Sequence, residues 1–473
     1  MRRAARMMHA VLPALLAACA VTAPTVAPPP PVAPTPDPAD AAFWARFGSP
    51  VLLDLQQQLL RENPDLLIAR QRLLIANDAV QLADAGQRPS LGFHAGPVDT
   101  TATSLADRGG ARPEAFELGF QASYELDLWG RLARLGDAAR AEALAAGADA
   151  DALRIATQCL LARRVFDLAR DEQMLPLLQQ RQVLAAERAQ LQGLRLHAGR
   201  IDAQTLADAE SQSSEAQSAL ANGTAQQRGD EARLALLFGE SARDDHSPLA
   251  PLQSMIRLPE VPADLPSTLL ERRPDVRAAA ARLAAARDRD AADRALRFPQ
   301  IRLTAALGVA TDVLHRAAHG AIALFGFGPE VDLPIYDGGA TAARIDSRDH
   351  ELAIAEIEYR QAGIAAFADV EHALQLRDTA ASALRDASAA RQRSDAAQQA
   401  LQLELEQGRR SRLDAIEARL QSLDAEQRVL DSYRAQLDSS LALFEALGGA
   451  WPLDRHPALS SSAAEIPLIR MSA

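Results

Sequence analysis

Two stretches of the sequence alternate between apolar and polar residues, which is the pattern of a β-strand with two different faces. In residues 116–128, every second residue from Phe116 onward is apolar, and Glu, Gly, Gln, Ser or Asp stands between them. In residues 301–309, Ile, Leu, Ala, Leu and Val alternate with Arg, Thr, Ala and Gly. Such strands contact an apolar medium on one face and water on the other. Weaker partner strands are predicted at 91–95 and 321–333.

Long helices are predicted for most of the remaining chain. Six stretches rich in Ala, Leu, Arg, Gln and acidic residues lack proline, except for Pro64, Pro176 and Pro274. One of them would be about 100 Å long at 1.5 Å per residue, so it must pack alongside other helices. The six stretches are residues 52–86, 131–196, 201–238, 267–297, 340–406 and 412–447.

The order helix, strand pair and two helices occurs twice, which indicates an internal duplication. The segment Asn63–Asp65 recurs 210 residues later as Arg273–Asp275, and the turn at Gly199 recurs at Gly408. The predicted domains are a first repeat, an inter-repeat segment, a second repeat and a C-terminal tail, at residues 43–238, 239–265, 266–451 and 452–473.

The N-terminus has the pattern of a bacterial secretion signal. Arginines precede a short apolar run that ends in a lipobox-like sequence, Leu16–Cys19. Residues 1–18 are predicted to be a signal peptide, and Cys19 is predicted to carry diacylglycerol and an N-acyl chain. An ordinary signal peptide with an incidental cysteine is the alternative. The proline-rich residues 19–42 are predicted to be an extended tether, and Ala20 is compatible with anchoring in the outer membrane.

Composition and motifs argue against two classes of function. The net charge is −12, and the 50 basic residues are all arginine, so a large basic surface for nucleic acid is not expected. The sequence has no His-Glu-x-x-His motif, phosphate loop or nucleophile elbow, so neither an enzyme nor a cofactor is predicted. The loop at 311–320 contains His315 and His319, and we interpret it as a polar turn, not a metal site.

Four strands per chain cannot close a membrane-spanning barrel. Open edges would leave unpaired backbone groups in lipid, each costing several kcal/mol, and small bacterial barrels have eight strands. A membrane location therefore requires several copies, and sequence physics alone leaves two, three or four copies open. A soluble two-faced sheet packed on helices is the alternative.

The chain resembles the TolC-type outer-membrane efflux family, in its lipoprotein branch. The similarity runs from about Phe43 to Trp451 and rests on the lipobox, the duplication and the motifs Tyr124–Arg131, Val331–Gly339 and Leu443–Trp451. The resemblance implies a mainly α protein with a transmembrane β part. In it, long coiled-coil helices form a periplasmic α-barrel, and four strands per protomer contribute to the twelve-stranded β-barrel of a homotrimer.

The implied function is that of a passive exit duct in a tripartite efflux pump of the resistance–nodulation–division type. A periplasmic adaptor and an inner-membrane pump would deliver small toxic compounds or drugs to the duct, which would be lipid-anchored in the bacterial outer membrane. The alternative function is a periplasmic coiled-coil lipoprotein that acts as an adaptor or structural spacer.

The resemblance also implies a periplasmic gate after Gly408. Asp414 and Glu417 would form stacked acidic rings, and Arg410 would help to keep the tip closed. Both carboxylates lie on one helical face because they are three residues apart, and rings of carboxylates attract cations. A solvated helix start, where acids are favoured in any case, is the alternative. The expected partners in the first repeat are Asp202, Gln204 and Thr205.

Overall fold

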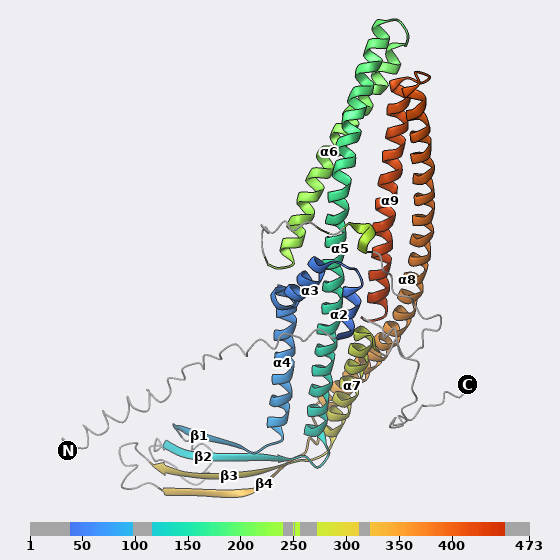
Figure 1. Ribbon diagram of the computed structural model, residues 1–473. Helices are drawn as coiled ribbons and strands as arrows, with labels where there is room; N and C mark the ends of the chain where they lie inside the picture. The colour runs from blue at the N-terminus through green and yellow to red at the C-terminus, as the bar shows by residue number, and fades with distance from the viewer. Residues whose placement is uncertain are drawn as a thin grey trace, which may run out of the picture. The chain divides into compact units, whose positions relative to one another are not determined.

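The chain is mainly helical and contains one four-stranded sheet, as the sequence predicts (Figure 1). The computed structural model describes residues 38–97, 116–239, 249, 251–255, 272–311 and 322–449. The predicted signal peptide, Cys19, nearly all of both loops between paired strands, most of the inter-repeat segment and the tail at 452–473 lie outside the described residues.

The elements of the first repeat follow a short N-terminal helix and end with two long helices. They are α2 (Pro38–Ala45), α3 (Pro50–Glu62), α4 (Pro64–Gly86), β1 (Ser90–Pro97), β2 (Phe116–Leu126), α5 (Arg131–His197) and α6 (Ala203–Leu236). A short 3-10 helix, η2 (Leu252–Met255), comes next. The elements of the second repeat are α7 (Pro274–Arg294), η4 (Ala295–Arg297), β3 (Gln300–Thr311), β4 (Ile322–Asp332), α8 (Ala340–Glu406) and α9 (Arg412–Ala446).

The longest helix of each repeat starts in the same way. Helices α5 and α8 each have 67 residues, and each follows a glycine in the left-handed conformation, Gly130 (φ 72°) or Gly339 (φ 93°). An aspartate precedes each glycine and accepts two backbone N–H groups at the helix start. These bonds measure 3.1 and 2.8 Å at Asp127, and 3.0 and 2.7 Å at Asp337. The duplicated sequence therefore produces a duplicated cap.

The predicted helix at 52–86 is in fact two helices, because Pro64 interrupts it. Asn63 has φ −63° and ψ 123°, the extended conformation favoured before proline. Its side chain accepts the N–H of Leu66 at 3.0 Å, so Asn63 ends α3 and caps α4. Pro176, in contrast, lies inside α5 without ending it.

The segment predicted as an extended tether, residues 19–42, is helical at its end, since α2 begins at Pro38. Burial of aromatic side chains explains this helix, because α2 and the turn after it contribute three rings to the main apolar core. The rings of Phe43 and Phe444 stack with their centroids 4.2 Å apart. Five aromatic residues of this core are no more than 4% exposed, namely Phe43, Trp44, Phe47, Phe166 and Phe444.

The sheet is antiparallel throughout, in the order β1-β2-β3-β4. Each repeat contributes one hairpin, and the pairing of β2 with β3 joins the two repeats. The helices contact one another in a related order, α4–α5–α7–α8, whereas the contacts of the second long helices run α6–α5–α9–α8 (Figure 1). Among the described residues, no helix combines the length and the apolar character needed to cross a membrane.

Candidate functional site at the helical tip and the α5–α9 interface

Helices α5 and α8 both end in a turn that requires glycine. Gly199 follows α5 with φ 66°, and Gly408 follows α8 with φ 70°. The N–H of Arg200 donates to the carbonyl of Arg195 at 2.9 Å, and the bond after Gly408 has the same length. This pattern satisfies the last helical carbonyls with a left-handed residue, so each glycine is needed for its positive φ.

The returning helices, α6 and α9, start with side-chain caps. Asp202 accepts the N–H of Thr205 at 2.8 Å and its hydroxyl at 2.6 Å. At α9, Ser411 and Asp414 form a reciprocal capping box: Asp414 accepts the N–H of Ser411 at 3.0 Å, and the Ser411 hydroxyl oxygen accepts the N–H of Asp414 at 3.3 Å. Asp414, predicted as a gate residue, therefore also fixes the start of its helix.

Both capping carboxylates are held in the ionised form. Hydrogen bonds from the backbone N–H and the hydroxyl of Ser411 lower the pKa of Asp414, and the charges of Arg410 and Arg195 lower it further. The hydroxyl and backbone N–H of Thr205 lower the pKa of Asp202. Each tip turn thus presents a fixed negative charge at neutral pH.

The other predicted gate residues lie near the same turns. Arg410 donates through Nε to Glu404, in the last turn of α8, at 2.9 Å. Glu417 lies one turn after Asp414 on α9. Gln204 donates to Asp208 at 2.8 Å within α6. In the described part of this single chain, no hydrogen bond or ion pair joins the first-repeat residues Asp202, Gln204 and Thr205 to the second-repeat residues Arg410, Asp414 and Glu417.

The closest polar contacts between α5 and α9 near the tip were not predicted from the sequence. Arg412 donates two hydrogen bonds to the carboxylate of Glu187, at 2.6 and 2.8 Å. The next residue of α5, Arg188, lies 3.9 Å from Glu417. Adjacent residues of opposite charge on α5 therefore pair with a base and an acid of α9. The two helices are connected at the first turns of α9.

This pairing continues along the whole interface as a ladder of ion pairs. Acids occur at every seventh position of α9, a spacing that keeps them on one helical face. They are Glu417, Asp424, Asp431, Asp438 and Glu445. Arginines of α5 face them: Arg188 lies 3.9 Å from Glu417, Arg181 pairs with Asp424, Arg170 lies 2.7 Å from Asp431, and Arg163 lies 4.0 Å from Asp438 and 2.6 Å from Glu445. The seven-residue spacing of acids was a signal that sequence analysis could have used.

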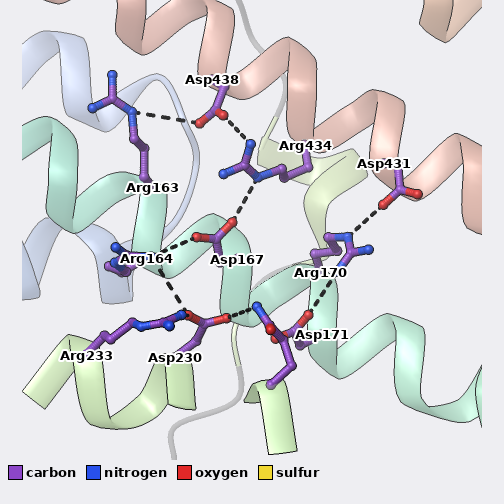
Figure 2. A network of polar contacts seen from close by, with 11 residues as sticks. Arg163, Arg164, Asp167, Arg170, Asp171, Asp230, Arg233, Asp431, Arg434 and Asp438 are labelled. Atoms are coloured by element: carbon purple, nitrogen blue, oxygen red, sulfur yellow. Dashed lines mark hydrogen bonds and ion pairs between the residues drawn. The ribbon is translucent and has the colours of Figure 1, made fainter. Parts of the chain in front are cut away.

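The ladder joins a larger network that also reaches α6 (Figure 2). Arg434 of α9 donates to Asp167 of α5 at 2.8 Å. Arg164 of α5 lies 3.8 Å from Asp230 of α6, which is 1% exposed and also accepts from Arg233 at 2.8 Å. Charged side chains thus connect the consecutive helices α5 and α6 and join α5 to α9, which is far away in the sequence.

Asp171 is an acid of this network that is only partly neutralised. Arg170 donates to one of its carboxylate oxygens at 3.1 Å, and the other oxygen is buried without a hydrogen-bond partner. Burial raises the pKa of Asp171 to about 6, with the nearby charge of Asp230 adding to the shift and that of Arg170 opposing it. The α5–α6 contact therefore contains a carboxyl group that titrates near neutral pH.

The described residues contain no group of three or more His, Cys, Asp or Glu side chains that could hold a metal ion. The candidate site described above consists of ion pairs and helix caps. These groups place charged side chains at the tip turns and hold neighbouring helices together.

Comparison with known proteins decides the family. The family model described as outer membrane efflux protein matches residues 55–240 and 265–449. The chain belongs to the outer membrane efflux protein family. The match divides into two segments that correspond to the two structural repeats, and it covers the helices that carry the tip and the ion-pair ladder.

Members of this family from two Pseudomonas species are similar to this chain over most of their length. The solvent efflux pump outer membrane protein SrpC of Pseudomonas putida is 28% identical over 412 residues, which cover 87% of each protein. The pyoverdine export outer membrane protein OpmQ of Pseudomonas aeruginosa is 30% identical over 439 residues, covering 87% of this chain and 88% of the relative.

A solved structure confirms the fold. The open state of the Neisseria gonorrhoeae MtrE outer membrane channel is 27% identical to this chain, with a TM-score of 0.75 and coverage of 85% of this chain and 90% of that channel. The resemblance that the sequence predicted is therefore confirmed, as are the fold class and the role. This efflux family member is the outer-membrane channel component of an efflux system.

Proposed function

We propose that three copies of this chain close into one water-filled duct, lipid-anchored in the outer membrane and continuing into the periplasm. The observation that carries the proposal is that the four-stranded sheet of a single copy has two edge strands. Among the described residues of one chain, β1 and β4 are the edge strands of the four-stranded sheet, and such edges are unfavourable in lipid. Three copies supply twelve strands and leave no edge. The family resemblance implies the same number of copies.

The helices support the same closure. Helices α4 and α8 stand at the two ends of the contact order α4–α5–α7–α8, and both expose apolar side chains. On α4 these are Ile68, Ile75 and Leu82 at seven-residue spacing, 49%, 68% and 76% exposed. On α8 they are Ile357, Ile364 and Phe367, 60%, 65% and 61% exposed. An apolar stripe of this kind at each end indicates that α4 of one copy packs on α8 of the next.

The partners and the cargo follow from the family. The family resemblance implies a passive duct, for which a periplasmic adaptor and an inner-membrane pump would supply recognition and energy. The relatives SrpC and OpmQ serve solvent efflux and pyoverdine export. For this chain we propose small toxic compounds or drugs as the cargo class, without a named substrate.

The gate lies at the tip turns. Asp414 and Glu417 of three copies would surround the duct axis as two acidic rings, and Arg410 and Arg412 would hold α8 and α9 in place through Glu404 and Glu187. Because the Glu187–Arg412 bond joins α5 to α9, opening of the tip requires that these ion pairs be exchanged or separated. Cys19, outside the described residues, would carry the lipid anchor.

The test is a measurement of mass and of conductance on the full-length protein. In detergent the protein should have the mass of three chains, and in planar bilayers it should form channels. A monomer that gives no conductance would reject the duct and would favour a periplasmic lipoprotein that acts as an adaptor or spacer. A conducting assembly with another number of copies would reject only the trimer.

A further inference from the structure

The two faces of the sheet differ in chemistry, and strand register brings like residues into rows. Phe93, Phe120, Leu307 and Phe325 lie side by side across the four strands. They are 53% to 80% exposed in the single chain, and the rings of Phe93 and Phe120 are 5.2 Å apart. In the proposed duct this apolar face meets lipid, so the opposite face lines the water-filled interior.

Several residues on the water-facing side of the sheet have small side chains or none. One row contains Gly92, Gln121, Ala306 and Gly326, and the next contains Ser123, Thr304 and Gly328. Gly119 and Gly308 are paired directly, and a Cβ on Gly308 would lie 2.8 Å from the carbonyl oxygen of Leu118. Five of the residues in these rows are therefore glycines, and Gly308 has no room for a side chain, while His94 and Leu324 stand in the same row as Gly119 and Gly308.

Long charged side chains on this face gather where the sheet joins the helices. Glu125, Arg302 and Glu330 stand opposite one another on β2, β3 and β4, and Asp332 follows Glu330 on the same face. Arg302 lies 3.9 Å from Glu330, and their side chains are 44% and 59% exposed. Glu125 is only 18% exposed because Arg131, at the start of α5, binds it at 2.6 Å.

We propose that Arg302 determines the charge selectivity of the duct at this junction, by offsetting the exposed acids Glu330 and Asp332. With Glu125 neutralised by Arg131, Arg302, Glu330 and Asp332 leave one positive and two negative exposed charges per copy among these residues. Three copies would form a ring with a modest excess of negative charge, and Arg302 is what keeps that excess small. This inference rests on the proposed duct, because only closure of the sheet turns the row into a ring.

Reversal potentials in planar bilayers across a KCl gradient would test the proposal. Arg302→Gln should raise the ratio of cation to anion permeability, and Glu330→Gln should lower it, each roughly twofold because unit charges at a pore wall act through water. The double variant should return close to the wild-type ratio. Each variant is also measured together with Asp414→Ala and Glu417→Ala, so that acids at the tip do not dominate the ratio.

Arg287→Gln is the matched control, because it also removes one exposed arginine per copy, from an ion pair with Glu356 between α7 and α8. It should leave the permeability ratio unchanged. If the wild-type protein conducts and Arg302→Gln shifts the ratio no more than Arg287→Gln does, the inference is overturned while the duct stands. If the wild-type protein does not conduct, the duct itself is rejected, and the selectivity ring is rejected with it.

Discussion

The side-chain amide of Asn63 donates a hydrogen bond of 2.7 Å to the carbonyl oxygen of Leu237, 174 residues later in the chain. Leu237 is the C-cap residue that follows α6, at the helix end where carbonyl groups lack partners within the helix. The bond ties the last helix of the first repeat to the junction of α3 and α4. In the second repeat, Arg273 donates to the carbonyl of Ala446 at 3.0 Å. Both repeats therefore have a hydrogen bond from the residue before a helix that begins with proline to the end of the last helix, but the donor is Asn63 in one repeat and Arg273 in the other.

Replacing Arg273 should destabilise the fold. Its guanidinium also binds Asp275 and Asp369, at 2.8 Å each, so one buried side chain joins α7, α8 and α9. We expect Arg273→Met to lower the free energy of unfolding by about 2–3 kcal/mol, since hydrogen bonds to charged groups are lost. Thermal unfolding followed by circular dichroism at one scan rate measures this.

Arg277→Met is the control for that experiment, since the exposed Arg277 pairs with Asp151 at 3.5 Å, its one ion pair among the described residues. Its effect should stay below about 1 kcal/mol. Equal effects of the two substitutions would show that the buried contacts of Arg273 add nothing to stability.

Gly448→Ala should cost more stability than Gly408→Ala. The two glycines have similar φ values, 74° and 70°, so alanine meets the same backbone strain at both, about 1 kcal/mol. At Gly448 the new Cβ would also lie 2.9 Å from the Cα of Arg273, whereas at Gly408 it meets open space. Unfolding midpoints of the two variants give the comparison, and equal midpoints would contradict the steric argument.

Asp171→Asn should change how stability depends on pH. The pKa of Asp171 is about 6, above its ordinary value of 3.8, so the folded protein binds this proton more readily than the unfolded chain does. Ionised Asp171 is therefore a destabilising group above pH 6, and its penalty disappears as the pH falls toward 4. The variant should unfold at a higher temperature than wild type at pH 7.5, and this advantage should vanish near pH 4.

Removing both predicted gate acids should increase ion flow through the tip. We expect the combined Asp414→Ala and Glu417→Ala variant to raise single-channel conductance and to weaken block by multivalent cations, because two acidic rings are lost. Since Asp414 also caps α9, Ser411→Ala serves as the control: it removes half of the capping box and keeps both carboxylates. Unchanged conductance and block in the double variant, or equal changes in Ser411→Ala, would reject the gate assignment.

The two cysteines allow a clean test of the lipid anchor. Cys19→Ser should abolish labelling of the protein with radioactive fatty acid, because the predicted thioether site is gone. Cys159→Ser should leave labelling intact, since Cys159 is fully buried between α5 and α9 and burial raises its pKa. Labelling that persists in Cys19→Ser would contradict the lipobox interpretation.

The local patterns of the sequence predicted the elements well. Alternation at 116–128 predicted β2, and long stretches rich in helix-forming residues predicted α5 and α8 within one or two residues, although α5 contains Pro176. Local rules failed at Asn63, where a single proline splits one predicted helix, and at Pro38, where a proline-rich segment becomes helical. At Pro38 the deciding contribution is burial of Phe43 and Trp44 against Phe444. Local sequence rules cannot predict this contact because Phe444 is far away in the sequence.

The sequence by itself determined the elements, the duplication and the glycine turns at Gly199 and Gly408, because these depend on neighbouring residues and on backbone stereochemistry. Tertiary structure alone decided which charges meet. Glu187 pairs with Arg412 and Asp171 faces Asp230 only because α5 lies between α6 and α9. Ion pairing acts over a few ångströms, so residues more than fifty positions apart interact only after packing has brought their helices together.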